Sequence, residues 1–151
     1  MIAFMTWLEG SALGHAMRES GVWTYAVVNL IHILGVASLF GSVLILDLRL
    51  MGFWRMVSLS AIRLPTVRLA VIGFTIASLS GVCLLATKAT EYVGNPFLYI
   101  KFVAIGAGLL NVAVLSRTVA WKQELELPLA GALSLLCWFT AVMAGRMIGY
   151  W

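Results

Sequence analysis

The chain has 151 residues, of which 62% are apolar and only 11% are charged, and its mean hydropathy is +1.02. About a quarter of the residues of an ordinary soluble domain are charged, so this composition excludes a water-soluble globular protein. The formal net charge of +4 comes from Lys and Arg residues scattered between apolar runs, without the basic face that nucleic-acid binding needs.

The N-terminal segment, residues 4–18, is predicted to form a short interfacial helix because Phe4, Leu8 and Ala12 recur at helical spacing. No Lys or Arg precedes its apolar part, so the basic region that begins a secretory signal peptide is missing. We therefore expect this helix to be retained and to lie on the membrane surface.

Four long apolar runs follow, at about residues 21–46, 69–87, 96–116 and 127–147. Each run can cross roughly 30 Å of hydrocarbon as a helix that rises about 1.5 Å per residue. Helices are required because lipid cannot satisfy an open sheet edge, and the runs lack the alternating pattern of a membrane barrel. The sequence therefore predicts an all-α fold, with a single transmembrane domain over residues 1–151 that forms an integral membrane four-helix bundle.

The positive charges of the connecting segments predict the orientation of the bundle. One group lies in the connections after the first and third spans, namely Arg49, Arg55, Arg63, Arg68, Arg117 and Lys122. A smaller group lies on the opposite side, namely Arg18, Lys88, Lys101 and Arg146. Because the more positive side faces the cytoplasm, we expect both termini outside and both connections inside a bacterial inner membrane.

His32 lies near the middle of the first span, with Asn29 on the same helical face and Gly35 about one turn further on. An ionisable side chain at that depth is costly and marks a candidate functional site. Imidazole is the commonest protein ligand of metals, and histidines of membrane helices can hold b-type haem. The alternative is structural: His32 and Asn29 hydrogen-bond a neighbouring helix, and Gly35 belongs to a helix-packing seam.

His15, on the interfacial helix, is the other histidine and the candidate second ligand of a haem or metal. If that helix folds back near residue 20, helical rise places His32 roughly 9 Å deeper than His15, which is too far for both imidazoles to hold one small ion. A porphyrin between tilted helices tolerates a larger offset. Two copies of His32 across a dimer would also supply an axial pair.

Four other polar residues of the spans receive an interpretation. Lys101 and Arg146, near the outer ends of the third and fourth spans, are the candidate partners of haem propionates. Their structural alternative is snorkelling, in which each cation reaches the membrane surface and forms interfacial ion pairs. Asp47, with Arg49 beside it at the opposite surface, is interpreted as a local cap and interface anchor rather than as a proton path, and Asn111 is predicted to donate an interhelical hydrogen bond.

Other metals and other chemistry find less support in the sequence. Zinc would need cysteine or carboxylate ligands at a matching spacing near the embedded histidine, and the sequence offers none. Copper stays an alternative through thioether ligands such as Met5, Met17 or Met143. Cys83 and Cys137 lie singly within apolar runs, as small hydrophobic residues do. The sequence has no nucleophile with an adjacent base and no phosphate-binding loop, which excludes hydrolase and kinase activities.

Short motifs spread over nearly the whole chain resemble those of a family of small uncharacterised bacterial four-helix membrane proteins. They are His32-Ile-Leu-Gly35, Gly41-Ser42, Leu46-Asp47-Leu48-Arg49-Leu50-Met51-Gly52, Glu91-Tyr92, Asn95-Pro96 and Ala144-Gly145-Arg146. The chain is also distantly similar to the membrane part of copper-resistance D-like proteins. The resemblance implies the four-helix topology and no settled activity. Relatives of cytochrome type offer several membrane histidines, whereas this chain has one clearly embedded, so a bis-histidine haem within a single chain does not follow.

Two functions are therefore predicted as alternatives. In the first, the protein carries a redox cofactor for electron transfer, b-type haem or less favourably copper, bound through His32 with His15, Gly35, Arg146 and Lys101 as further candidates. In the second, it is a non-catalytic accessory subunit that packs on other membrane subunits or on copies of itself. The short connections leave little chain to receive a substrate, so neither alternative is a stand-alone enzyme.

Overall fold

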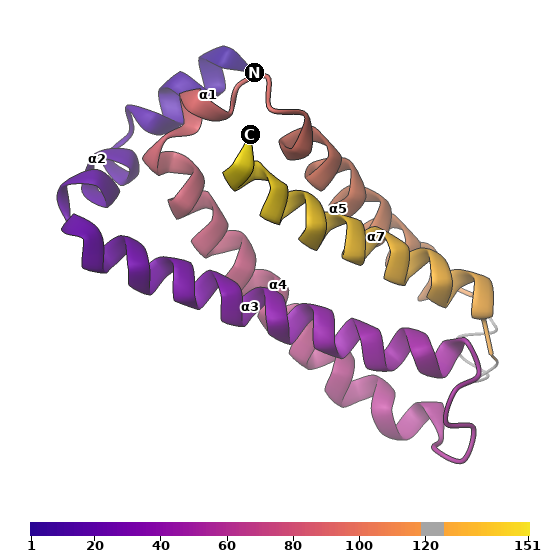
Figure 1. Ribbon diagram of the computed structural model, residues 1–151. Helices are drawn as coiled ribbons and strands as arrows, with labels where there is room; N and C mark the ends of the chain where they lie inside the picture. The colour runs from indigo at the N-terminus through magenta and orange to yellow at the C-terminus, as the bar shows by residue number, and fades with distance from the viewer. Residues whose placement is uncertain (119–125) are drawn as a thin grey trace.

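The computed structural model describes residues 1–118 and 126–151, in which all regular structure is helical (Figure 1). Within this part of the chain, the helices long and apolar enough to cross a membrane are α3 (Gly21–Leu50), α4 (Leu59–Thr87), α5 (Pro96–Leu115) and α7 (Pro128–Met147). The shorter elements are α1 (Ile2–Glu9), α2 (Ala12–Glu19) and the 3-10 turns η1 (Ala89–Tyr92) and η2 (Ile148–Tyr150). The predicted all-α fold with four candidate membrane spans is confirmed.

Side-chain caps mark where three of these helices, α2, α4 and α5, begin. Ser11 Oγ accepts a hydrogen bond from the Gly14 N–H at 3.2 Å, at the start of α2. Asn95 Oδ1 accepts from the Phe97 N–H at 2.9 Å, and Pro96 takes the first position of α5, where its missing N–H costs nothing. These caps satisfy N–H groups that have no partner within the helix.

Two boundaries differ from the sequence prediction. The helix expected over residues 4–18 is divided at Gly10 into α1 and α2. The second span begins at Leu59 rather than near residue 69, so Pro65 lies inside α4. Hydropathy marks the part of a helix that lies in hydrocarbon, whereas the helix itself continues into the interface, where charged side chains reach water.

The four long helices form two antiparallel hairpins, α3–α4 and α5–α7. In the first hairpin the backbones touch, because a Cβ added at Gly73 would lie 2.6 Å from the Leu39 nitrogen. In the second hairpin the Asn111 side chain donates to the Ala130 carbonyl at 3.0 Å, which confirms its predicted interhelical hydrogen bond. Small residues thus let helices approach closely in both hairpins, as in other membrane bundles.

The hairpins meet at the end that holds the α3–α4 connection, here called the loop end (Figure 1). There the Leu127 N–H donates to the Leu50 carbonyl at 3.0 Å, and a Cβ at Gly131 would lie 2.7 Å from the Asp47 carbonyl oxygen. Toward the opposite end, which holds both chain termini and is called the terminal end, α3 and α7 diverge.

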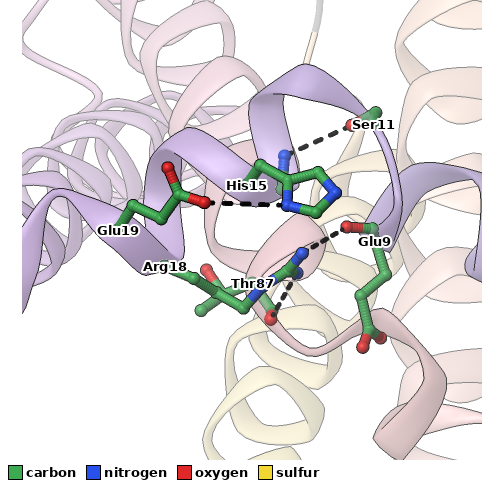
Figure 2. A network of polar contacts seen from close by, with 7 residues as sticks. Glu9, Ser11, His15, Arg18, Glu19 and Thr87 are labelled. Atoms are coloured by element: carbon green, nitrogen blue, oxygen red, sulfur yellow. Dashed lines mark hydrogen bonds and ion pairs between the residues drawn. The ribbon is translucent and has the colours of Figure 1, made fainter.

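The α1–α2 segment covers the terminal end by packing where α4 ends and α5 begins. Its buried side chains join an apolar cluster of Met5, Leu8, Ala86, Ala89 and Leu98. Polar contacts reinforce the cluster: Arg18 donates to the Thr87 carbonyl at 3.3 Å and to the Glu9 carbonyl at 2.9 Å (Figure 2). The Glu9 carboxylate accepts from the N–H and hydroxyl of Thr90, each at 2.7 Å.

Candidate functional site

His32 lies on α3 and hydrogen-bonds across the first hairpin. Its Nδ1 lies 3.1 Å from Ser80 Oγ of α4. The ring fits against α4 because residue 81 is glycine: a Cβ at Gly81 would lie 3.1 Å from His32 Cε1. The side chain is half-buried, and the part of the ring that contacts α4 is the Nδ1–Cε1 edge.

The hydroxyl of Ser80 determines which ring nitrogen carries the proton. Ser80 donates its single hydroxyl proton to the Ile76 carbonyl at 2.5 Å. Toward His32 it can therefore act only as an acceptor, so Nδ1 is the protonated nitrogen of the neutral ring. The ring also lies within hydrogen-bonding reach of the Ala77 backbone, and in this tautomer the other nitrogen, Nε2, carries the lone pair.

Gly35 contacts α4 rather than an open space. A Cβ at this position would lie 2.8 Å from the Ala77 nitrogen and 3.0 Å from the Gly73 carbonyl oxygen. This geometry corresponds to the helix-packing alternative for Gly35. A flat group beside His32 would therefore have to lie on the side of the ring that faces away from α4.

A crevice of about 610 Å³ opens at the terminal end, between α3 on one side and η2 on the other. Its lining mixes apolar, aromatic and charged side chains, which is typical of the membrane–water interface. The residues are Met17, Arg18, Gly21, Val22, Tyr25, Leu84, Thr87, Lys88, Glu91, Tyr92, Ile148, Gly149 and Trp151. Its volume falls within the usual range of ligand pockets.

Helical periodicity places the candidate site just below this crevice. His32 lies seven residues, or two turns, beyond Tyr25 on the same face of α3. Ser80 lies one turn below Leu84 on α4, and Gly145 lies almost one turn below Ile148 on α7. His32 does not itself line the crevice, and helical rise places it about 10 Å deeper than Tyr25.

Lys101 reaches the same region from α5. Its side chain crosses Gly145 of α7, since a Cβ added there would lie 3.5 Å from the Lys101 Nζ. The ammonium is close enough to His32 for a charge interaction. It forms no ion pair with any residue that the structure describes. A half-buried cation with no counter-charge is available to an acidic group of a ligand.

Arg146 and His15 have partners of their own. Arg146 donates to the Tyr150 hydroxyl and its guanidinium lies 4.8 Å from the centre of the Tyr150 ring. His15 is exposed on α2, where its Nδ1 lies 3.9 Å from a Glu19 carboxylate oxygen (Figure 2). Within the described residues no hydrogen bond joins His15 to His32, and no three His, Cys, Asp or Glu side chains gather as a metal site.

Residues 4–151 match the sequence model of a protein family described as a family of unknown function, DUF6644. The chain belongs to the DUF6644 family. The match includes the α1–α2 segment as well as the four spans, in agreement with the predicted membership of an uncharacterised family. No curated protein and no solved structure matches the chain.

Two polar residues of this DUF6644 chain have surroundings that the sequence did not indicate. In the sequence Ser80 is part of the apolar run 69–87. Its hydroxyl is the only local sign that it could hydrogen-bond another helix. Asp47 was interpreted as a cap and interface anchor, and this was wrong: its side chain is 3% exposed. Gly131 lets α7 approach so closely that the carboxyl is covered, and Ser134 of α7 lies in hydrogen-bonding contact with it.

Proposed function

We propose that this small multi-pass membrane protein binds a redox cofactor, b-type haem, with His32 Nε2 as the axial ligand. One observation carries the proposal. The Ser80 hydroxyl orients the imidazole and holds the proton on Nδ1, which leaves the Nε2 lone pair free. Ligating histidines are commonly fixed in this way by a hydrogen bond to the nitrogen that does not bind the metal.

The surroundings of His32 suit an amphipathic macrocycle with acidic groups. The crevice nearer the membrane surface is lined by apolar and aromatic side chains together with charged ones, which suits a ring that carries acidic groups. Lys101, which lacks a counter-charge among the described residues, would pair with one carboxylate. Arg146 is a second candidate near the same membrane surface, after exchange of its contact with Tyr150.

Haem, when bound, supplies one-electron redox chemistry, and the protein's part is to hold and orient it. His15 is exposed and lies against Glu19, so support for a second axial ligand from the same chain is weak. A single axial histidine, or His32 from two copies of the chain, fits the donor set better. Copper stays the alternative metal, and it would need donors besides the imidazole, such as the thioethers of Met5, Met17 or Met143.

The absorption spectrum of the purified protein, oxidised and then reduced with dithionite, tests the proposal. We expect a Soret band that disappears in His32→Ala and returns when imidazole is added to that variant. Ser80→Ala should keep the band but weaken haem affinity about tenfold or more, because the ring loses its orienting partner. His15→Ala is the matched control and should leave the spectrum unchanged.

A folded, colourless and metal-free preparation from haem-replete cells would overturn the haem proposal. Metal analysis of the same sample identifies copper if that is the bound metal. The accessory-subunit alternative would then be the better account. It is favoured by positions such as Gly41 and Gly106, which present open space for close approach by another helix.

A further inference from the structure

Asp47 is the only aspartate in the sequence, and its carboxyl is buried where the two hairpins meet. It lies on α3, one turn before that helix ends at Leu50. Gly131 of α7 brings the facing backbone into contact, and Ser134, itself 3% exposed, covers the carboxyl from the same face of α7. An ionisable side chain inside a membrane span is a candidate site unless its partners account for it.

The partners of Asp47 do not account for a charge. Ser134 is in hydrogen-bonding contact with the carboxyl, but Oδ2 has no hydrogen-bond partner among the described residues. A serine hydroxyl carries no charge and provides one proton. One oxygen of the Asp47 carboxyl therefore lacks a hydrogen-bond partner, and residues 1–118 and 126–151 supply no counter-ion to it.

The charged groups nearest in sequence are engaged with one another. Arg49 donates from Nε to the Val57 carbonyl at 2.7 Å, and its Nη1 lies 3.7 Å from Glu126. Arg55 forms a second ion pair with Glu126, at 3.0 Å. These contacts hold the α3–α4 connection to the start of α7 and engage both guanidinium groups. Lys101 lies in the other half of the bundle, beside His32.

Burial of a carboxylate without a cation costs far more free energy than burial of the neutral acid in the same place. Such a group therefore normally takes up a proton. We propose that Asp47 is a proton-binding site, at which the neutral acid is held between Ser134 and the α3–α7 contact. This site is separate from the proposed haem site, since His32 lies fifteen residues, or roughly 22 Å of helical rise, away along α3.

The position of Asp47 gives its proton a short route to the loop end. Only three residues separate it from the end of α3, which corresponds to about 4.5 Å of helical rise. Beyond that end lies Glu126, which is partly exposed and paired with Arg49 and Arg55. Asp47 therefore exchanges its proton with the solution at the loop end, and the rest of the bundle separates it from the terminal end.

Because the chain contains a single aspartate, carbon-13 labelling of the aspartate side chain reports on Asp47 without any mutation. We expect the infrared spectrum of the intact protein in lipid at neutral pH to contain the carbonyl band of a protonated carboxylic acid that shifts with the label. This band should be exchanged for carboxylate bands only when the pH is raised. Label-sensitive carboxylate bands at neutral pH and below would overturn the proposal.

A membrane-soluble carbodiimide gives an independent readout, since it reacts with protonated carboxyl groups in apolar surroundings. The acid proton goes to one carbodiimide nitrogen and the carboxyl oxygen bonds to the central carbon, and the adduct rearranges to a stable N-acylurea. We expect mass spectrometry to locate this adduct on Asp47, with less of it as the pH rises and none in Asp47→Asn. A water-soluble carbodiimide should instead modify the exposed Glu19 and spare Asp47. Equal modification of both carboxyls by the water-soluble reagent would contradict the proposal.

Discussion

Gly73 lies at the closest crossing of α3 and α4, and its replacement by alanine tests the packing on which the His32 site rests. A Cβ at this position would lie 2.6 Å from the Leu39 nitrogen and 2.7 Å from the Gly35 carbonyl oxygen. Ordinary contacts of a Cβ begin at 3.4 Å, so the helices must separate by about 0.8 Å at this point. Both obstructing atoms belong to backbone and cannot turn aside as a side chain would.

The expected loss follows from this overlap. Forcing a methyl group into a close-packed contact costs about 1–3 kcal/mol. Alanine also favours a helix over glycine by up to about 1 kcal/mol, which acts in the opposite direction. Gly41→Ala on α3 is the matched control, because it gains the same helix propensity and its new methyl group meets nothing within 4 Å. We expect Gly73→Ala to be less stable than Gly41→Ala by about 2 kcal/mol.

Reversible unfolding in mixed detergent micelles, followed by circular dichroism, measures this difference. The two variants are compared at the same protein concentration, so that any association of the chain contributes equally. Equal stability of Gly73→Ala and Gly41→Ala would refute the reasoning, because it would mean that α3 and α4 do not touch at Gly73.

Two further predictions concern the terminal end and the orientation. The pKa of Glu9 is lowered because its carboxylate accepts hydrogen bonds from the Thr90 N–H and hydroxyl, so this contact is fully formed above the ordinary value of 4.5 and is lost as the pH falls below it. The protection factor of the Thr90 amide, which corrects the observed exchange rate for the intrinsic slowing of exchange in acid, should therefore fall as the pH falls, and Glu9→Gln should remove that pH dependence; an unchanged profile in the variant would contradict the assignment. For orientation, a background without Cys83 and Cys137 carries a single cysteine at Met56, which is 98% exposed, or at Glu19. In intact cells an impermeant thiol reagent should label Glu19→Cys and spare Met56→Cys, and the reverse pattern would place the termini in the cytoplasm.

The spans could be predicted from the sequence because hydropathy and helical rise together determine which segments cross the membrane. The start of α4 could not, because a helix can extend beyond the part of it that lies in hydrocarbon. Pro65 removes one backbone hydrogen bond of α4 but does not end the helix, since it lies near the start of α4. The division between α1 and α2 had a local signal, because Ser11 is a good capping residue just before Ala12.

Of the candidate site, His32 could be found from the sequence and its partner could not. The partner depends on the register between α3 and α4, which the contact of Gly35 with Ala77 sets. Three residues before Gly35 is His32, and three residues after Ala77 is Ser80, so antiparallel helices bring these two together. No local pattern encodes that register.

The same lack of tertiary information explains the misreading of Asp47. A charged residue at the end of an apolar run normally lies at the membrane surface, and Arg49, with its partners in the connection and at Glu126, behaves in that way. Asp47 is covered only because Gly131, some eighty residues later, lets α7 pack against it. Neither residue reveals this contact by itself.

The two hairpins have a consequence for a molecule that binds between them. Each hairpin is joined along its own length, whereas the contacts between hairpins lie at the loop end, around Trp138 in the middle of the bundle, and in the cluster around Met5 and Leu98. The crevice therefore lies at the terminal end between the two units, with residues of α3 and α4 on one side and residues that follow α7 on the other. A molecule that binds there would touch both hairpins at once.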